Sequence, residues 1–371
     1  MKPFIPQKLP LTEVNWESLI SLMGKANRSI AYYYGVLNVV PNPDVLLSPM
    51  RTQEGVLSSK MEGTQATLGE VLEFEADKEP KDDDKRLDIQ EILNYRKALF
   101  HAGEELQTRP FNLNLLKELH DILLNSVRGR DKGRGQFRVT QNWIGRPGTP
   151  MDEADFVPPE PALLMEYLDN WEKYYHADQL DPLVQLAIVH AQFEIIHPFN
   201  DGNGRLGRIL VPLFLYEKKV LSSPMFYLSE YLEKYRDEYI SRLRSIGMEG
   251  DGWTQWIGFF LKAVDEQSLI NAEKVKSIIK LYDKLKARVM ELTHSVYAVA
   301  ILDQIFMRPI FQGSQLRLPD NLKPTRGTVT NLLRSFIKAG ILNIVREGKG
   351  RRPQILVFPA LMDICEGKKT G

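Results

Sequence analysis

The stretch from Leu183 to Ile196 constrains the fold more than any other part of this sequence. It follows Asp181-Pro182, a helix-capping side chain and the residue favoured at the first helical position. Apolar residues then occupy nearly every face of the helix, and such a helix is stable in water only when other elements surround it. We therefore expect a central buried helix in a mainly α-helical protein.

The rest of the chain favours the same architecture. Apolar residues recur at helical spacing in two further segments, from Leu113 to Leu123 and from Leu163 to Trp171. Strand signals are few. The main one is a β-favouring stretch at 137–145 with a Gly/Pro-rich exit, which we interpret as a small β-hairpin. At 371 residues the chain has room for about two or three domains.

Composition narrows the class of protein further. Hydrophobic residues make up 43% and charged residues 26%, the balance of a globular chain. The single cysteine, Cys365, excludes an internal disulfide framework and a thiolate zinc cluster, and it suits a reducing compartment. No apolar stretch approaches the roughly 18 residues that span a bilayer, and no signal peptide is visible. We expect a cytoplasmic protein that has no membrane contact.

The segment from Glu291 to Gly371 differs in charge from the rest. It holds 12 Lys/Arg and 6 Asp/Glu, although the whole chain has 48 of each. Its pattern predicts helix, short helix, helix and then two strands, 341–345 and 354–358, around a basic Gly-rich tip. This arrangement resembles a winged helix-turn-helix domain, a family that often binds DNA and also serves as a protein-interaction module. The expected DNA contacts are Arg326, Lys349, Arg351 and Arg352.

The segment from His197 to Arg208 carries the chemistry. It reads His-Pro-Phe-Asn-Asp-Gly-Asn-Gly-Arg-Leu-Gly-Arg and joins the buried helix to a second helix. Gly202 and Gly204 permit conformations in which backbone N–H groups turn inward as an anion nest, at the positive end of the second helix. Arg205 and Arg208 share a face of that helix, and two guanidiniums beside a nest suit a polyphosphate.

Two further side chains complete this site. A carboxylate beside a phosphate site, here Asp201, is the usual ligand for Mg²⁺. His197 is able to take a proton from a hydroxyl near pH 7. The combination implies attack on a nucleoside triphosphate, and no G-x-x-x-x-G-K-[ST] pattern of a P-loop occurs in the chain.

The same twelve residues match every defined position of H-P-F-x-[D/E]-G-N-G-R-x-x-R, and so resemble the signature of the Fic family. The resemblance covers roughly residues 50 to 260 and implies a helical Fic core, ATP as substrate and Mg²⁺ as cofactor. Most such proteins are protein adenylyltransferases, which move AMP to a Tyr, Thr or Ser hydroxyl of a target protein; self-modification is also expected. Gly204 favours AMP transfer, because Doc-like relatives that phosphorylate have Lys there.

The resemblance also implies roles for single residues. It makes His197 the general base and Asp201 the Mg²⁺ ligand. The expected nucleotide-binding residues are Gly202, Asn203, Gly204, Arg205, Arg208 and Tyr239. The hairpin lies where the family has a flap that aligns the target segment by strand addition. The expected target-docking residues are Trp143, Ile144, Gly145, Arg146 and Pro147.

Residues 58–63 resemble the family's inhibitory motif, [S/T]-x-x-x-E-[G/N]. Ser58 and Glu62 lie one helical turn apart, and Gly63 closes the helix. A carboxylate at this end opposes the helix dipole, so we expect a cation beside Glu62. The resemblance identifies that cation as Arg208, whose pairing with Glu62 would keep it from the γ-phosphate of ATP. We therefore expect an autoinhibited enzyme.

Four parts are expected along the chain. These are an N-terminal helical region at 1–110, a Fic catalytic core at 111–265, a linking helix at 266–289 and a winged-helix domain at 290–371. Related multidomain proteins often dimerise, so a homodimer is expected. Three alternatives stay open: removal of AMP, transfer of UMP or phosphocholine, and a DNA-binding regulator that uses nucleotide only as a signal. No motif identifies the target protein.

Overall fold

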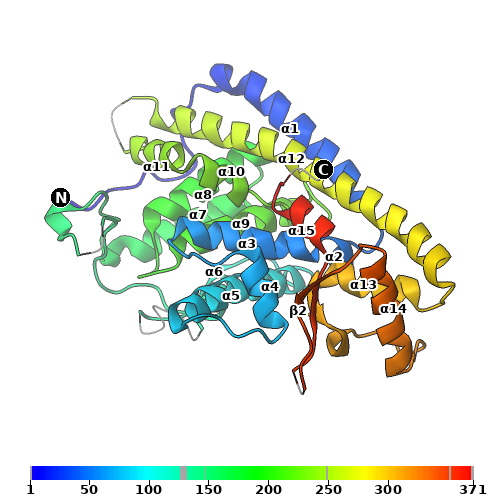
Figure 1. Ribbon diagram of the computed structural model, residues 1–371. Coiled ribbons are helices and arrows are strands. Elements are labelled where there is room, and N and C mark those ends of the chain that lie inside the picture. The colour runs from blue at the N-terminus through cyan, green and yellow to red at the C-terminus, as the bar shows by residue number, and fades with distance from the viewer. Residues whose placement is uncertain (1, 126–131, 147, 248–249, 351, 369–371) are drawn as a thin grey trace. The chain divides into compact units, whose positions relative to one another are not determined.

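The computed structural model describes residues 2–125, 132–146, 148–247, 250–350 and 352–368 (Figure 1). It divides into two compact units, each assembled from non-contiguous segments. The first unit comprises Met1–Tyr34, Leu57–Gly63 and Leu93–Leu269, and the second comprises Gly35–Val56, Thr64–Ile92 and Ile270–Gly371. The predicted mainly helical fold with a small amount of β-structure is confirmed.

The helices follow one another through most of the chain. Those before residue 125 are α1 (Trp16–Asn38), α2 (Pro43–Leu46), α3 (Ser48–Met61), α4 (Leu68–Glu75), α5 (Asp83–Glu105) and α6 (Leu113–Leu123). Those that follow are α7 (Leu164–His176), α8 (Pro182–Ile196), α9 (Asn203–Glu217), α10 (Ser229–Lys234), α11 (Arg236–Ser245) and α12 (Gly252–Thr293). None of the helices within the described ranges is both long and apolar enough to cross a membrane.

The core of the first unit surrounds α8, as its sequence predicts. The helix packs against both α7 and α9, and from Leu183 onward every residue is buried except Glu194. Two buried indoles secure it, because Trp171 and Trp256 donate to the carbonyls of Val189 and Ala187 at 2.9 and 2.8 Å. The half-buried Glu194 is therefore the one break in an otherwise fully buried surface.

The expected hairpin after residue 137 forms only in outline. Ile144 and Phe156 make an isolated antiparallel bridge, in which the Ile144 N–H donates to the Phe156 carbonyl at 2.8 Å. No longer ladder forms in this part of the described chain. The returning segment contains Pro158 and Pro159, and proline has no N–H to donate to a partner strand.

The C-terminal part of the second unit contains the two expected longer helices and the two expected strands, has a 3-10 helix where a short helix was expected, and adds a strand and a last helix that the pattern did not predict. It holds α13 (Ala298–Met307), β1 (Ile310–Gln312), a short 3-10 helix (Gly313–Gln315), α14 (Arg326–Lys338), β2 (Asn343–Arg346), β3 (Ile355–Val357) and α15 (Pro359–Cys365). The strands form one antiparallel sheet in the order β1-β3-β2. Within the same unit α13 packs on α2 and β1 packs on α4.

Candidate active site

The loop between α8 and α9 forms the centre of the candidate site, and two left-handed residues shape it. His197 ends α8 with φ 49° and ψ 61°, and Gly202 precedes α9 with φ 78°. Glycine adopts this region freely, whereas a residue with a Cβ pays about 1–3 kcal/mol for it. Neighbouring contacts must therefore hold His197 in this conformation.

Arg138 supplies those contacts. Its Nε donates to the carbonyl of His197 at 3.0 Å, and its Nη2 donates to the carbonyls of Pro159 at 2.5 Å and Ile196 at 3.4 Å. Arg138 is 2% exposed, and burial lowers the pKa of its guanidinium to about 10. The buried guanidinium thus clamps the carbonyls that the end of α8 leaves without helical partners.

Asn203 braces the loop from the first turn of α9. Its Oδ1 accepts from the N–H of Phe199 at 2.9 Å, and its Nδ2 donates to the carbonyl of Phe199 at 2.8 Å. The side chain of Asn142 donates to the same carbonyl at 3.0 Å, which ties the 137–145 segment to the loop. The Asn203 side chain, predicted to bind nucleotide, is therefore bonded to the backbone of the loop.

His197 enters the cleft as a neutral base. Its Nδ1 lies 3.3 Å from the carbonyl of Glu194. Because a carbonyl only accepts, the proton belongs on Nδ1, and Nε2 is left as the basic nitrogen. Burial lowers the pKa of His197 to about 4, so the ring is uncharged at pH 7.

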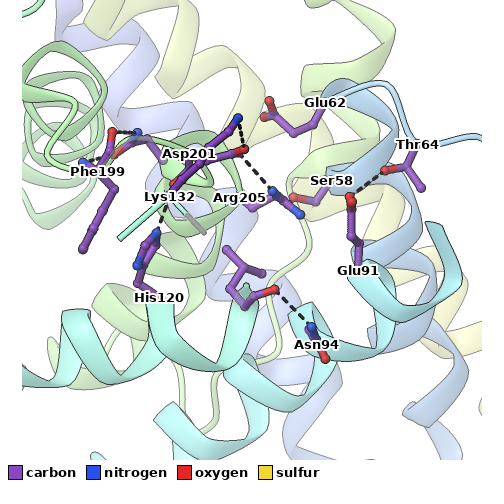
Figure 2. A network of polar contacts seen from close by, with 12 residues as sticks. Ser58, Glu62, Thr64, Glu91, Asn94, His120, Lys132, Phe199, Asp201 and Arg205 are labelled. Carbon is purple, nitrogen blue, oxygen red and sulfur yellow. Dashed lines mark hydrogen bonds and ion pairs between the residues drawn. The ribbon is translucent and has the colours of Figure 1, made fainter. Parts of the chain in front are cut away.

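Asp201 lies between two cations (Figure 2). The Nζ of Lys132 is 2.9 Å from its Oδ2, and the Nη2 of Arg205 is 3.4 Å from its Oδ1. Burial would raise the pKa of Asp201, but Lys132 and Arg205 together bring it below its ordinary value, so the carboxylate is ionised. His120 fixes the backbone: its Nδ1 accepts from the N–H of Gly135 at 2.8 Å, so its Nε2 donates to the Asp201 carbonyl at 3.1 Å.

The donor set at Asp201 fits Mg²⁺ that arrives with phosphates. Mg²⁺ is commonly held by one or two carboxylates together with substrate phosphates and waters. No group of three or more His, Cys, Asp or Glu side chains is arranged for a metal in the described part of the chain. The ionised Asp201 at the rim of an anion nest supplies one ligand, and the substrate would supply the others.

Arg208 is held by the inhibitory motif. Its Nε donates to the Oγ of Ser58 at 2.8 Å, and its Nη2 donates to the Ser58 carbonyl at 3.0 Å and to the Oε1 of Glu62 at 2.5 Å. Burial opposes the charge on both groups. Each partner nevertheless holds the other ionised, since Glu62 raises the pKa of Arg208 and Arg208 lowers that of Glu62. The predicted ion pair is present.

Two glycines make room for this pair. A Cβ on Gly204 would clash with the Oε1 of Glu62 and lie 3.1 Å from the Nη1 of Arg208. Gly63 adopts φ 100° directly after α3 and Glu62, a conformation that side chains disfavour. The contact between Glu62 and Arg208 therefore depends on glycine at positions 63 and 204 as well as on the two charges.

Tyr239 and His190 support Arg208 from behind. The Nδ1 of His190 donates to the Gly207 carbonyl at 3.0 Å, so its Nε2 accepts from the Tyr239 hydroxyl at 2.9 Å. The charge of Arg208 opposes the rise that burial causes in the pKa of the Tyr239 hydroxyl. Burial lowers the pKa of His190 to about 3, so this ring stays neutral. Tyr239, expected in the nucleotide pocket, forms part of its wall.

One cleft of about 560 Å³, within the range of small-molecule sites, is lined by these predicted site residues: Glu62, His197, Asp201, Gly202, Asn203, Gly204, Arg208 and Tyr239. The predicted nucleotide-binding residue Arg205 is buried and is not part of this lining. The flap borders the cleft with Trp143 and Ile144, which are 43% and 37% exposed. The indole of Trp143 donates to the Thr149 carbonyl at 2.7 Å. Gly145 also lines the cleft, Arg146 is exposed, and the predicted docking residue Pro147 lies outside the described residues.

The four predicted DNA contacts lie in the second unit. Arg326 is the exposed first residue of α14. Lys349 and Arg352 are exposed and face each other in an isolated bridge at the tip between β2 and β3. Arg351 lies outside the described residues.

Sequence reasoning missed four residues of the catalytic site. They are His120, Lys132, Arg138 and Glu194. Glu194 carried a signal, because it is the one charged residue in the apolar run of α8. The other three act through contacts with residues more than fifty positions away, and no local pattern marks such contacts.

Two family models match the chain: "Fic/DOC family N-terminal" over residues 20–104 and "Fic/DOC family" over residues 110–215. A probable protein adenylyltransferase of Aquifex aeolicus is 28% identical over 204 residues, which cover 54% of this chain and 57% of that protein. The protein adenylyltransferase Fic of Drosophila grimshawi is 32% identical over 162 residues, 42% of this chain and 31% of that protein. The match thus spans little more than half of one relative and a third of the other.

Solved structures agree on the fold. A Fic family protein from Desulfovibrio desulfuricans superposes with a TM-score of 0.57 at 18% identity, over 96% of this chain and 98% of that one. Fic-1 of Caenorhabditis elegans gives 0.54 at 19% identity, over 72% and 75%. The helical core, the loop with its anion nest and the two family matches define a Fic-type protein. The chain belongs to the Fic/DOC family.

Proposed function

We propose that the protein is an adenylyltransferase that transfers AMP from ATP to Tyr, Thr or Ser hydroxyls of target proteins and of itself. The observation that carries this proposal is the neutral His197, with Nε2 as its basic nitrogen, which lines the same cleft as Gly202, Gly204 and the ionised Asp201. A base for a hydroxyl next to a polyphosphate site is what nucleotidyl transfer requires. The relatives that the chain resembles carry the same activity in their names.

The residues divide the reaction between them. His197 Nε2 accepts the hydroxyl proton as the hydroxyl oxygen forms a bond to the α-phosphorus, and the bond to the bridging oxygen breaks to release pyrophosphate. Mg²⁺, when bound, offsets charge that builds up on the phosphates. Asp201 would hold it, while the loop N–H groups, Arg205 and Arg208 bind phosphate oxygens. The flap aligns the target segment by main-chain pairing.

Arg208 is not available for this task while Glu62 and Ser58 hold it. Three charge-assisted hydrogen bonds occupy its Nε and Nη2, and the one to Glu62 joins two ionised groups. We therefore propose that the resting protein is autoinhibited, and that displacement of Glu62 frees Arg208 for the γ-phosphate.

Intact-mass spectrometry after incubation with Mg²⁺ and ATP tests the proposal. The Glu62→Gly protein should gain one AMP per modified site and wild type little. The Glu62→Gly/His197→Ala double variant is the matched control and should gain none. A gain of phosphate instead of AMP, or no gain in any variant, would refute AMP transfer.

One observation favours a second activity of the same site. The carboxylate of Glu62 faces the cleft beside His197, with 38% of its side chain exposed. A carboxylate there is placed to orient a water, which would let wild type remove AMP from a modified protein. Release of AMP from such a protein by wild type, but not by Glu62→Gly, would support it. Incubation with UTP or CDP-choline tests the other donors by their mass shifts.

We propose further that residues 290–371 form a winged helix-turn-helix domain. The remaining proposed parts of the chain are the N-terminal helical region at 1–110, the Fic catalytic core at 111–265 and the linking helix at 266–289. The element order and the antiparallel β1-β3-β2 sheet support the winged helix-turn-helix domain. Exposed Arg326, Lys349 and Arg352 support DNA as its partner. Fluorescence anisotropy with duplex DNA should give affinity that falls steeply with salt and falls further when these residues are alanine. If His197→Ala leaves DNA-dependent regulation intact, the result would favour the alternative of a DNA-binding regulator that uses nucleotide only as a signal.

Assembly and location complete the proposal. We propose a homodimer, which sedimentation at several protein concentrations would detect. A cytoplasmic location is supported by the single cysteine, Cys365, because a chain without an internal disulfide suits a reducing compartment. Fractionation of cells that express the tagged protein would test it.

A further inference from the structure

Glu194 is a carboxyl residue of this cleft that the proposed reaction does not use. It lies on α8 one turn before His197 and lines the cleft together with Glu62, Arg208 and Tyr239. Its Oε1 is fully buried and has no hydrogen-bond partner in the described structure. Buried carboxyl oxygens are nearly always bonded, so an orphan of this kind calls for an explanation.

The position of Glu194 places it beside Arg208. Its Oε1 is packed so closely against Gly207 that a Cβ there would clash with it, and Gly207 directly precedes Arg208 on α9. The charges of Arg208 and Glu62 both act on the Glu194 carboxyl. The Arg208 guanidinium therefore interacts electrostatically with two carboxyl groups, of which only Glu62 is hydrogen-bonded to it.

We propose that Glu194 is the reserve partner of Arg208: when Glu62 leaves, the Glu194 carboxylate takes the guanidinium and competes with the nucleotide phosphates for it. Glu194 is thus a positioning residue that acts through Arg208. The inference rests on the proposed function only in assuming that Arg208 binds phosphate. It predicts that removal of Glu62 releases the site incompletely.

Protonation supports this exchange. Burial, reinforced by Glu62 and opposed by Arg208, raises the pKa of Glu194 to about 7. Loss of Glu62 removes a negative charge that raises the pKa of Glu194, and it leaves Arg208 without its partner. The pKa of Glu194 therefore falls, and the carboxyl ionises near neutral pH. The groups around Glu194 do not titrate between pH 6 and 8.5. The pKa of Glu62 is lowered, and the pKa values of Arg208 and Tyr239 are raised. The pKa values of His190 and His197 are lowered to about 3 and about 4.

The test is the binding of ATP, measured by isothermal titration calorimetry from pH 6 to 8.5. In Glu62→Gly the Kd for ATP should rise by roughly fivefold or more across this range, the effect of about 1 kcal/mol of competition. In Glu62→Gly/Glu194→Gln the rise should disappear, and the Kd at pH 8 should be lower than in the single variant. Titration of ATP itself is common to both proteins and cancels in the comparison.

The outcomes separate the hypotheses. Equal pH profiles in the two variants would overturn the role of Glu194 even if AMP transfer proceeds. The predicted difference without AMP transfer would uphold Glu194 and refute the proposed function. If Glu194 has only a structural role, Glu194→Gln should lower the Tm in wild type and in Glu62→Gly without changing the pH profile of ATP binding. If our proposal is correct, Glu62→Gly/Glu194→Asp should restore part of the pH dependence.

Discussion

The ion pair between Glu62 and Arg208 both stabilises the resting protein and blocks the site. Glu62→Gln should therefore lower the thermal stability of the nucleotide-free protein and increase the stabilisation that ATP provides. Two charges about 4 Å apart attract by roughly 4 kcal/mol at an effective dielectric constant near 20. The exposed 38% of Glu62 admits solvent screening, and glutamine retains a polar contact. We therefore expect a loss of about 1–2 kcal/mol, below the 3–5 kcal/mol for breaking a fully buried pair.

The assay is thermal unfolding with and without Mg²⁺ and ATP. Without nucleotide, the Tm of Glu62→Gln should fall by about 2–8 °C, taking about 2–4 °C per kcal/mol for a unit of this size. ATP at 100 times the Kd of wild type should stabilise wild type by about 2.7 kcal/mol. The same ATP concentration should stabilise Glu62→Gln by more, because Arg208 is free to bind phosphate and the Kd is lower.

A neighbouring ion pair provides the control. Glu233 pairs with Lys60, two residues before Glu62, at 2.7 Å and with both side chains partly exposed. Glu233→Gln should lower the Tm little and leave the effect of ATP as in wild type. The reasoning is refuted if Glu62→Gln matches wild type in both conditions, or if ATP stabilises the two proteins equally.

Three further predictions follow from the same site. Arg138→Met should lower kcat for AMP transfer by roughly tenfold or more, because His197 loses the hydrogen bond that holds its backbone. Arg138→Lys should retain part of the activity. Both variants are measured with labelled ATP in the Glu62→Gly background. Gly204→Ala should cost about 1–2 kcal/mol in urea unfolding of wild type and less in Glu62→Gly, where the clash with Glu62 is absent. The buried neutral His120, with its pKa lowered to about 4, binds a proton in the unfolded state at a higher pH than in the folded state, so stability should fall as pH drops from 6.5 to 4. His120→Gln should reduce that slope by up to about 1.4 kcal/mol per pH unit, measured by urea unfolding at several pH values.

The helical core was accessible from sequence because its signals are local. The apolar run of α8, the Asp181 cap and the glycines of the following loop each restrict the chain within a few residues, and the structure follows them. The flap was overestimated for a local reason too. Its first strand reads as β, but pairing also needs N–H donors in the returning chain, where Pro158 and Pro159 have none.

The supporting contacts of the site were not accessible in the same way. Arg138 is an ordinary residue in a β-favouring stretch, and its importance arises from carbonyls of α8 that fall within its reach. Lys132 likewise acquires a role only when folding places it on Asp201. The contact of Glu62 with Arg208 spans 146 positions in the chain and was foreseen from a motif resemblance, because charge alone could not choose among the available arginines.

The inhibitory segment Leu57–Gly63 is joined at both ends to chain that belongs to the second unit. Glu62 is therefore an intramolecular ligand, and its effective concentration at Arg208 is set by this double tether. Dilution of the protein does not weaken such a ligand, whereas ATP competes with it in proportion to the nucleotide concentration. At a fixed ATP concentration, relief of inhibition consequently requires an event that lowers the local concentration of this one carboxylate at Arg208.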